Sequence, residues 1–168
     1  MSVVAVKVYD KEIIMSADSI IIHGESDKTP VGRGKIFEVN NMLIGTSGYA
    51  SEGIHMALFA ENHAPLAMND RELTRWMHEF EEWRVKEFGI ERNQMTYQNS
   101  YIIAYKEKVF FCNAGYIGEI NDYFAIGAGH TYAAAALYLG HSPQEAVRVA
   151  CALSCYVDEP IITKSLPK

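Results

Sequence analysis

The first 50 residues alternate short apolar runs with turn-forming residues. Apolar β-branched side chains dominate these runs, and Asp10-Lys11 and Asn40-Asn41 separate them. Such runs, bounded by turn signals, are typical of short strands joined by hairpins. Pro30 and several glycines mark residues 23–34 as a loop. The pattern therefore predicts strands over residues 3–8, 12–16, 19–22, 35–39 and 42–46.

Helical periodicity follows the strands. Leu73, Trp76, Met77, Phe80 and Trp83 recur at helical spacing, which is the stripe of an amphipathic helix packed on a core. This stripe favours a packing or subunit face over a cofactor site. Helices are predicted over 51–62 with Ser51 as N-cap, over 70–88 with Asp70 as N-cap and Gly89 as its end, over 130–139, and from Ser142-Pro143 to about residue 154.

The order of elements indicates the fold class. Further strands are predicted over 99–105, 108–113, 116–119, 123–126 and 157–163, where Pro160 restricts the last one to a sheet edge. Strands and helices are thus grouped and do not alternate, which favours an α+β arrangement of sheets covered by helices over a doubly wound sheet. With about 150 residues per domain, the 168 residues predict a single domain, 1–168.

Composition excludes several classes of function. The formal net charge is −6 and no basic stripe occurs, so nucleic acid is not an expected partner. No apolar window of membrane-spanning length and no signal peptide are found, so we expect a cytoplasmic protein without a membrane span. The odd, sparse set Cys112, Cys151 and Cys155 fits a reducing compartment.

The common metal and nucleotide motifs are absent from the sequence. The six histidines form no HExxH motif and no two-Cys, two-His set. Cys151 and Cys155 lie four apart on one predicted helix, which favours a core or interface role. Gly127-Ala128-Gly129 lacks the third glycine of a dinucleotide loop, since Tyr132 occupies that position, and indicates a tight turn. No cofactor and no metal are therefore expected.

The N-terminus carries candidate chemistry. Ser2 is small enough to allow removal of Met1, and it would then bear both a hydroxyl and a free α-amine with a pKa of about 8. Such an amine can serve as the base that activates its own hydroxyl. Because many proteins begin with Met-Ser, this feature needs support from the rest of the chain.

Four segments supply that support. Asp18 follows Ser2 by sixteen positions, at the end of the first predicted hairpin. The other segments are Gly34-Lys35-Ile36, Met42-Leu43-Ile44-Gly45-Thr46-Ser47-Gly48, and Phe124-Ala125-Ile126-Gly127-Ala128-Gly129 with the Ala-rich run after it. In this order, over about residues 2–155, they resemble the proteasome β-subunits and the bacterial HslV peptidase.

The resemblance implies a role for each matched residue. Ser2 would be the nucleophile and its amine the base, Lys35 would lower their pKa values, Asp18 would hold Lys35, and the Gly48 amide would stabilise the oxyanion. Register with the family also suggests Ile20, Arg33 and Gly45 as substrate-pocket residues, and Asp158 as an acid near the amine.

The sequence departs from the family pattern in three places. Serine replaces the usual threonine, and Ala128 stands where the family has a serine that assists the amine. Asp18 and Lys35 are separated by one residue more than the family spacing. A rival alignment places Met1 at the nucleophile position and implies a dead subunit, but it requires an extra residue in the first hairpin. We favour the ungapped alignment.

The resemblance implies a four-layer αββα sandwich of the N-terminal nucleophile hydrolase type. It also implies a self-compartmentalising peptidase that acts on peptides or unfolded proteins within a homo-oligomeric ring. An AAA+ unfoldase would be a separate partner, since this chain has no ATP-binding loop. The alternatives are a catalytically silent shell or assembly subunit and an N-terminal nucleophile amidase that acts on small amides.

Overall fold

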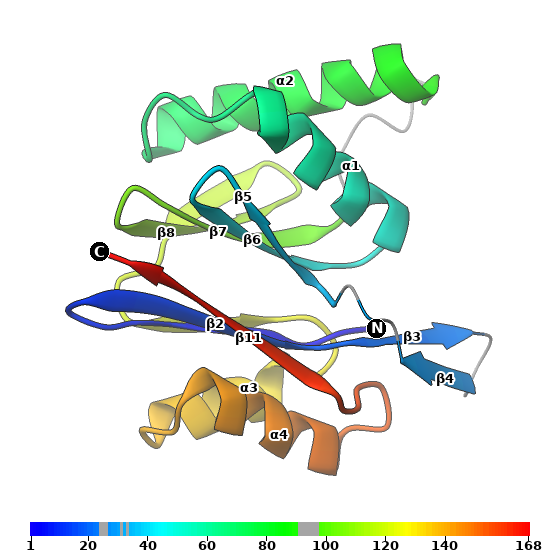
Figure 1. The fold of residues 1–168 in the computed structure, drawn as a ribbon, viewed down its shortest axis with the longest axis vertical. Coiled ribbons are helices and arrows are strands. Elements are labelled where there is room, and N and C mark those ends of the chain that lie inside the picture. The colour runs from blue at the N-terminus through cyan, green and yellow to red at the C-terminus, as the bar shows by residue number, and fades with distance from the viewer. Residues whose placement is uncertain (24–26, 31, 33, 91–97) are drawn as a thin grey trace.

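Two antiparallel sheets lie face to face, and a pair of helices covers the outer face of each (Figure 1). The computed structural model describes residues 1–23, 27–30, 32, 34–90 and 98–168. The predicted αββα sandwich is therefore confirmed.

The four-stranded sheet has the order β10-β1-β2-β11, and all its pairs are antiparallel. The N-terminal hairpin forms its centre, so the first strand is protected on both sides. Helices α3 and α4 cover its outer face. The elements are β1 (Val4–Val8), β2 (Glu12–Asp18), β10 (Tyr123–Ile126), β11 (Ile161–Pro167), α3 (His130–Tyr138) and α4 (Pro143–Leu153).

The five-stranded sheet is a meander of order β5-β6-β7-β8-β9, and helices α1 and α2 cover it. Its elements are β5 (Ile36–Val39), β6 (Met42–Ser47), β7 (Ser100–Tyr105), β8 (Lys108–Asn113), β9 (Tyr116–Glu119), α1 (Ala50–Asn62) and α2 (Asp70–Phe88). A separate ribbon of β3 (Ile20–His23) and β4 (Asp27–Pro30) extends from the end of the sandwich where the N-terminus lies (Figure 1).

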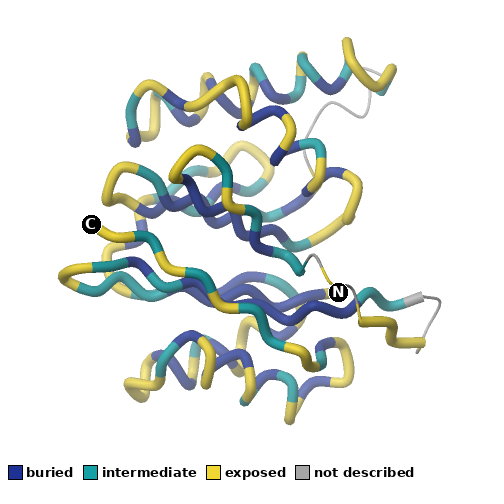
Figure 2. Tube along the Cα trace, viewed as in Figure 1, coloured by how far each residue is buried: buried dark blue, intermediate teal, exposed yellow. Residues whose placement is uncertain are grey.

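Three apolar layers hold the four structural layers together. Alternation along the first strand assigns its side chains to two of them: Val4 and Val6 pack between the sheets, whereas Val3 and Ala5 pack against α3 and α4. Figure 2 shows the resulting buried stretches in both sheets and on the inner sides of the helices.

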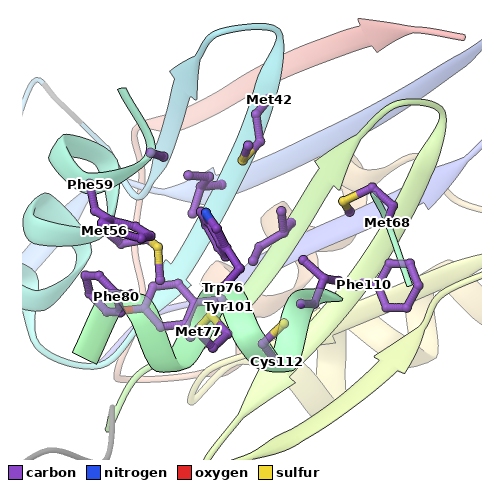
Figure 3. Packing of buried hydrophobic residues seen from close by; sticks show 14 residues of the cluster. Met42, Met56, Phe59, Met68, Trp76, Met77, Phe80, Tyr101, Phe110 and Cys112 are labelled. Atoms are coloured by element: carbon purple, nitrogen blue, oxygen red, sulfur yellow. The ribbon is translucent and has the colours of Figure 1, made fainter. Parts of the chain in front are cut away.

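The third layer lies between the five-stranded sheet and helices α1 and α2. The predicted stripe of α2 packs there, fully buried except for the half-buried Trp83, and Trp76 lies among the aromatic side chains of both helices (Figure 3). Phe59 of α1 lies 5.4 Å from Trp76 and 5.5 Å from Phe80, measured between ring centroids. The stripe is thus a packing face, as predicted.

Several local predictions are confirmed, and others are corrected. The turns at Asn40-Asn41 and Lys106-Glu107 have positive φ at both residues, as tight hairpins require. Ser142 and Glu145 form a capping box with Pro143 in the first turn of α4. However, Ser51 does not cap α1, whose N-cap is Tyr49, and Asn69 replaces Asp70 as the N-cap of α2.

Two strand predictions were also wrong in extent. The predicted loop at 23–34 contains β4, whose side chains are exposed and give no apolar pattern to recognise. The last strand begins at Ile161, after Pro160, and runs to Pro167 at a sheet edge. No helix in the described ranges is long and apolar enough to cross a membrane.

Candidate active site

Asp18 and Lys35 meet at the end of the sandwich that holds the N-terminus. Asp18 is the last residue of β2, and Lys35 immediately precedes β5 of the opposite sheet, so the fold brings them together across the gap between the sheets. Lys35 Nζ lies 2.6 Å from Asp18 Oδ2. The backbone N–H of Val3 donates to the other carboxylate oxygen at 2.8 Å, which fixes the carboxylate against the first strand.

Burial acts against both charges of this pair. The Asp18 side chain is fully buried and that of Lys35 is 12% exposed. Burial raises the pKa of the Asp18 carboxyl, and the Lys35 charge and its hydrogen bond oppose this rise. Burial likewise lowers the pKa of Lys35, and Asp18 opposes this fall. The fold therefore keeps two charges together in a place that penalises each one alone.

Both Met1 and Ser2 lie beside this pair. Lys35 Nζ donates to the Met1 carbonyl at 3.1 Å. Burial, followed by the positive charge of Lys35, lowers the pKa of the Met1 α-amine, while Asp18 acts in the opposite direction. Ser2 is only 3% exposed. The direct contact of Lys35 is thus with residue 1, and Ser2 follows it by one peptide bond.

The turn after β10 packs against the backbone of Ser2. Gly129 N donates to the Ser2 carbonyl at 3.2 Å. Gly127 has φ +92°, and a Cβ there would overlap the same carbonyl group. The glycines predicted from sequence as a tight turn therefore allow close backbone approach at this site. Ala128 between them is exposed.

Gly48 also lies at this site, in the turn from β6 to α1. Its φ of +138° suits glycine, and a Cβ would overlap the carboxamide of Asn99. Asn99 was not among the residues singled out from sequence, because a lone asparagine before a strand carries no motif. All four predicted catalytic residues, Ser2, Asp18, Lys35 and Gly48, are brought to one end of the sandwich.

A cavity of about 420 Å³ opens at this end of the sandwich. Met1, Ser2, Lys35 and Gly48 line it. Most other side chains around it are apolar: Ile20, Ile21, Ile22, Phe37, Tyr49 and Ile54. A concave apolar site with a few convergent polar groups is the usual form of a substrate pocket.

The predicted pocket residues have different outcomes. Ile20 lines the cavity, as expected. Gly45 does not, because it packs between the sheets, where a Cβ would lie 2.7 Å from Met15 Sδ and from a Val4 methyl group. Arg33 lies outside the described residues. Asp158 pairs with Lys28 at 3.0 Å, on the β3–β4 ribbon.

The cysteines and possible metal ligands add no second centre. Cys151 is half-buried against the core beneath the four-stranded sheet, and Cys155 is exposed. Within the described ranges, no three His, Cys, Asp or Glu residues are grouped so that they could hold a metal ion.

Comparison with known proteins identifies the architecture. No family model and no curated protein matches the chain. Among solved structures, BPH from Thiobacillus denitrificans in complex with epoxomicin superposes with a TM-score of 0.85 at 18% identity, over 98% of each chain. Eukaryotic HslV from Trypanosoma brucei superposes with a TM-score of 0.76 at 20% identity, over 99% of each chain. The chain has the HslV fold.

A second structure of the same Thiobacillus BPH has a TM-score of 0.85 at 17% identity, and it covers 98% of this chain and 97% of its own. The HslV fold thus accounts for the whole chain, from the first strand to β11. At these identities the likeness concerns the fold, and the chemistry has to be argued from the site.

Proposed function

We propose that this chain is a peptidase of the proteasome and HslV type, with Ser2 as its N-terminal nucleophile once Met1 is removed. The observation that carries the proposal is the buried Asp18–Lys35 pair, which contacts the backbone of residues 1 and 3, on either side of Ser2, at the edge of an apolar cavity. Buried pairs of this kind seldom increase stability, so their presence in a cavity points to function.

Removal of Met1 would change this site in two ways. The Ser2 nitrogen becomes an α-amine, and the carbonyl that accepts from Lys35 leaves with the methionine. Lys35 then lies near the new amine, because the Ser2 nitrogen is two covalent bonds away from the Met1 carbonyl oxygen that Lys35 contacts before removal. The burial and positive charge that lower the pKa of the Met1 amine would act on the Ser2 amine too, which favours the neutral form that a base requires.

The reaction then follows from the arrangement. The Ser2 hydroxyl attacks the scissile carbonyl carbon while the amine takes its proton, and the Gly48 amide stabilises the oxyanion. When the C–N bond breaks, the proton passes to the leaving amine, and an ester remains on Ser2. A water molecule, deprotonated by the same amine, hydrolyses this ester and restores the enzyme.

Peptides and unfolded polypeptides are the proposed substrates, and the apolar cavity would accept an apolar side chain. We also propose a homo-oligomeric ring in the cytoplasm, with any AAA+ unfoldase supplied as a separate chain. The neighbouring structure bound to epoxomicin lends support to the choice of inhibitor below.

A silent subunit is the second candidate, and one observation favours it. With Met1 in place, the Lys35 contact and the nearby α-amine both belong to residue 1, which has no hydroxyl. Ala128, in the place of the family serine, lies in the turn beside it. On this interpretation, residue 1 holds the nucleophile position and Met1 blocks it.

The deciding experiment combines intact mass, N-terminal sequencing and labelling with epoxomicin. The peptidase proposal predicts loss of one methionine and stoichiometric labelling, which Ser2→Ala abolishes. Labelling that persists in Ser2→Ala would refute Ser2 as the nucleophile.

A length variant separates the two candidates. In it, one threonine is inserted between Met1 and Ser2, so that removal of the methionine leaves threonine at the position that Met1 now holds. The silent-subunit interpretation predicts retained Met1 and no label on the native chain, but labelling of the variant. The peptidase proposal predicts that the native chain is labelled and that the variant is labelled less.

A further inference from the structure

A fully buried asparagine brackets the turn that contains Gly48. Asn99 immediately precedes β7, and its carboxamide makes three hydrogen bonds, one to the end of β6 and two to the turn between β6 and α1. Its Oδ1 accepts from the backbone N–H of Tyr49 at 2.6 Å, and its Nδ2 donates to the Tyr49 carbonyl and to Thr46 Oγ1, both at 2.9 Å. Gly48 lies between these two anchored residues.

The same carboxamide also fills the space beside Gly48. A Cβ on Gly48 would overlap Asn99 Oδ1 and lie 3.1 Å from Asn99 Cα. Glycine adopts positive and negative φ with similar ease, so the sequence alone does not hold this residue at φ +138°. The bonds on either side of Gly48, and the packing against it, restrict a peptide that would otherwise rotate.

Glu52 in turn fixes the position of Asn99. This carboxylate lies in the first turn of α1 and is buried. It accepts from the backbone N–H groups of Gln98 and Asn99 at 3.1 and 3.0 Å, and from the Tyr101 hydroxyl at 2.9 Å. Arg84 of α2 donates to it at 3.1 Å. The turn, the first turn of α1 and the start of β7 therefore form one closed hydrogen-bonded unit.

We propose that Asn99 is a positioning residue that holds the Gly48 peptide ready for the oxyanion, with Glu52 as its anchor. The inference rests on the proposed function. Donors stabilise a transition state best when they are already oriented, because no reorganisation is then needed during the reaction. Loss of the Asn99 hydrogen bonds should therefore weaken binding of the transition state more than binding of the ground-state peptide.

The test compares Asn99→Ala with Asn113→Ala. Asn113 lies opposite Ser100, and its side chain donates to Ser100 Oγ at 2.8 Å, so the control also removes an asparagine hydrogen bond next to β7. We expect Asn99→Ala to lower kcat by about tenfold to a hundredfold with KM nearly unchanged, since one oxyanion donor is worth about a hundredfold or more. The control should retain the native kcat.

A peptide boronate supplies a readout that a general loss of structure would not give. It forms a tetrahedral adduct with the nucleophile, so its affinity should fall in Asn99→Ala by the same factor as kcat/KM. A non-covalent peptide inhibitor of the same sequence should bind both proteins equally. Equal losses for the two inhibitors, or an unchanged kcat, would overturn the positioning role.

Hydrogen exchange separates this inference from the proposed function. In Asn99→Ala, amides of the peptide covering residues 45–53 should exchange faster, whether or not the chain is an enzyme. If the native protein neither cleaves nor labels, the proposed function fails, and unchanged exchange would then overturn the role of Asn99 as well. Should Asn99→Ala not fold, Thr46→Val removes one of the three bonds at similar volume and should give a smaller change in the same direction.

Discussion

The Asp18–Lys35 pair allows a quantitative test by a double-mutant cycle. Lys35→Met removes the cation and leaves a fully buried carboxylate with backbone donors alone. Breaking a buried pair costs about 3–5 kcal/mol, and we expect the lower end, about 3 kcal/mol, because Lys35 lies near the rim. For a chain of this size that loss lowers Tm by about 6–12 °C.

Asp18→Asn should cost less. An asparagine oxygen can still accept the Val3 N–H bond, and the Lys35 side chain can shift toward solvent through the rim. We expect a loss of about 1–2 kcal/mol. The double variant should be little worse than Lys35→Met alone, which gives a coupling energy of about 1–2 kcal/mol.

The pH dependence of the same variants follows from the Asp18 pKa. Burial raises this pKa, and Lys35→Met removes the charge that opposes the rise. At pH values between the ordinary pKa and the raised pKa, the Asp18 carboxyl is protonated in the folded state and ionised in the unfolded state. The free energy of unfolding therefore falls as the pH increases through this range. The amount by which Lys35→Met lowers the free energy of unfolding, relative to the unsubstituted protein, should therefore shrink as the pH is lowered.

Urea unfolding at a fixed protein concentration measures both effects. Each variant is compared with the unsubstituted protein at the same pH, because the other carboxylates contribute equally to the pH dependence of unfolding in both proteins. Two results would refute the reasoning. The first is strict additivity of the single variants, which would mean that the pair does not interact. The second is a deficit of Lys35→Met that stays constant or grows on acidification.

Three further predictions test other parts of the fold. Gly45→Ala would place a Cβ 2.7 Å from Met15 Sδ between the sheets, and thermal unfolding should show a loss of about 1–3 kcal/mol. Asn69→Ala removes the cap of α2 and should cost about 1 kcal/mol in urea unfolding, whereas Asn69→Asp should cost little. Maleimide should label exposed Cys155 in the native protein, but Cys112, whose pKa burial raises to about 12, only after unfolding; mass spectrometry distinguishes the two.

Local signals in the sequence were sufficient to predict most of the helices and strands. Turns such as Asn40-Asn41 and the Ser142-Pro143 helix start depend on residues within a few positions, so their chemistry can be read directly. Boundaries shifted where a neighbour competed for the same role: Asn69 rather than Asp70 caps α2. The order of elements predicted the α+β arrangement, whereas the four layers were predicted from the resemblance to the proteasome and HslV family.

Long-range pairing could not be predicted in this way. β11 pairs with β2, more than a hundred residues earlier, and no local pattern specifies this edge. Asn99 illustrates the same limit within the site. Its importance comes from bonds to Thr46 and Tyr49, about fifty positions away, and only the fold brings them together. Gly45 does not line the pocket, because the face of β6 on which it lies is turned toward the other sheet.

The proposed mechanism depends on how the N-terminal segment lies beside Lys35 before and after removal of Met1. Val4 and Val6 face the space between the sheets, and Ser2, two residues before β1 begins, lines the cavity together with Lys35. The Lys35 contact with residue 1 is made to a carbonyl that exists only while Met1 is attached. Under the proposed function, removal of Met1 would do two things at once: it would create the amine that acts as base, and it would release Lys35 from its hydrogen bond to the Met1 carbonyl. A nucleophile at Ser2 requires both changes, and a single cleavage supplies them.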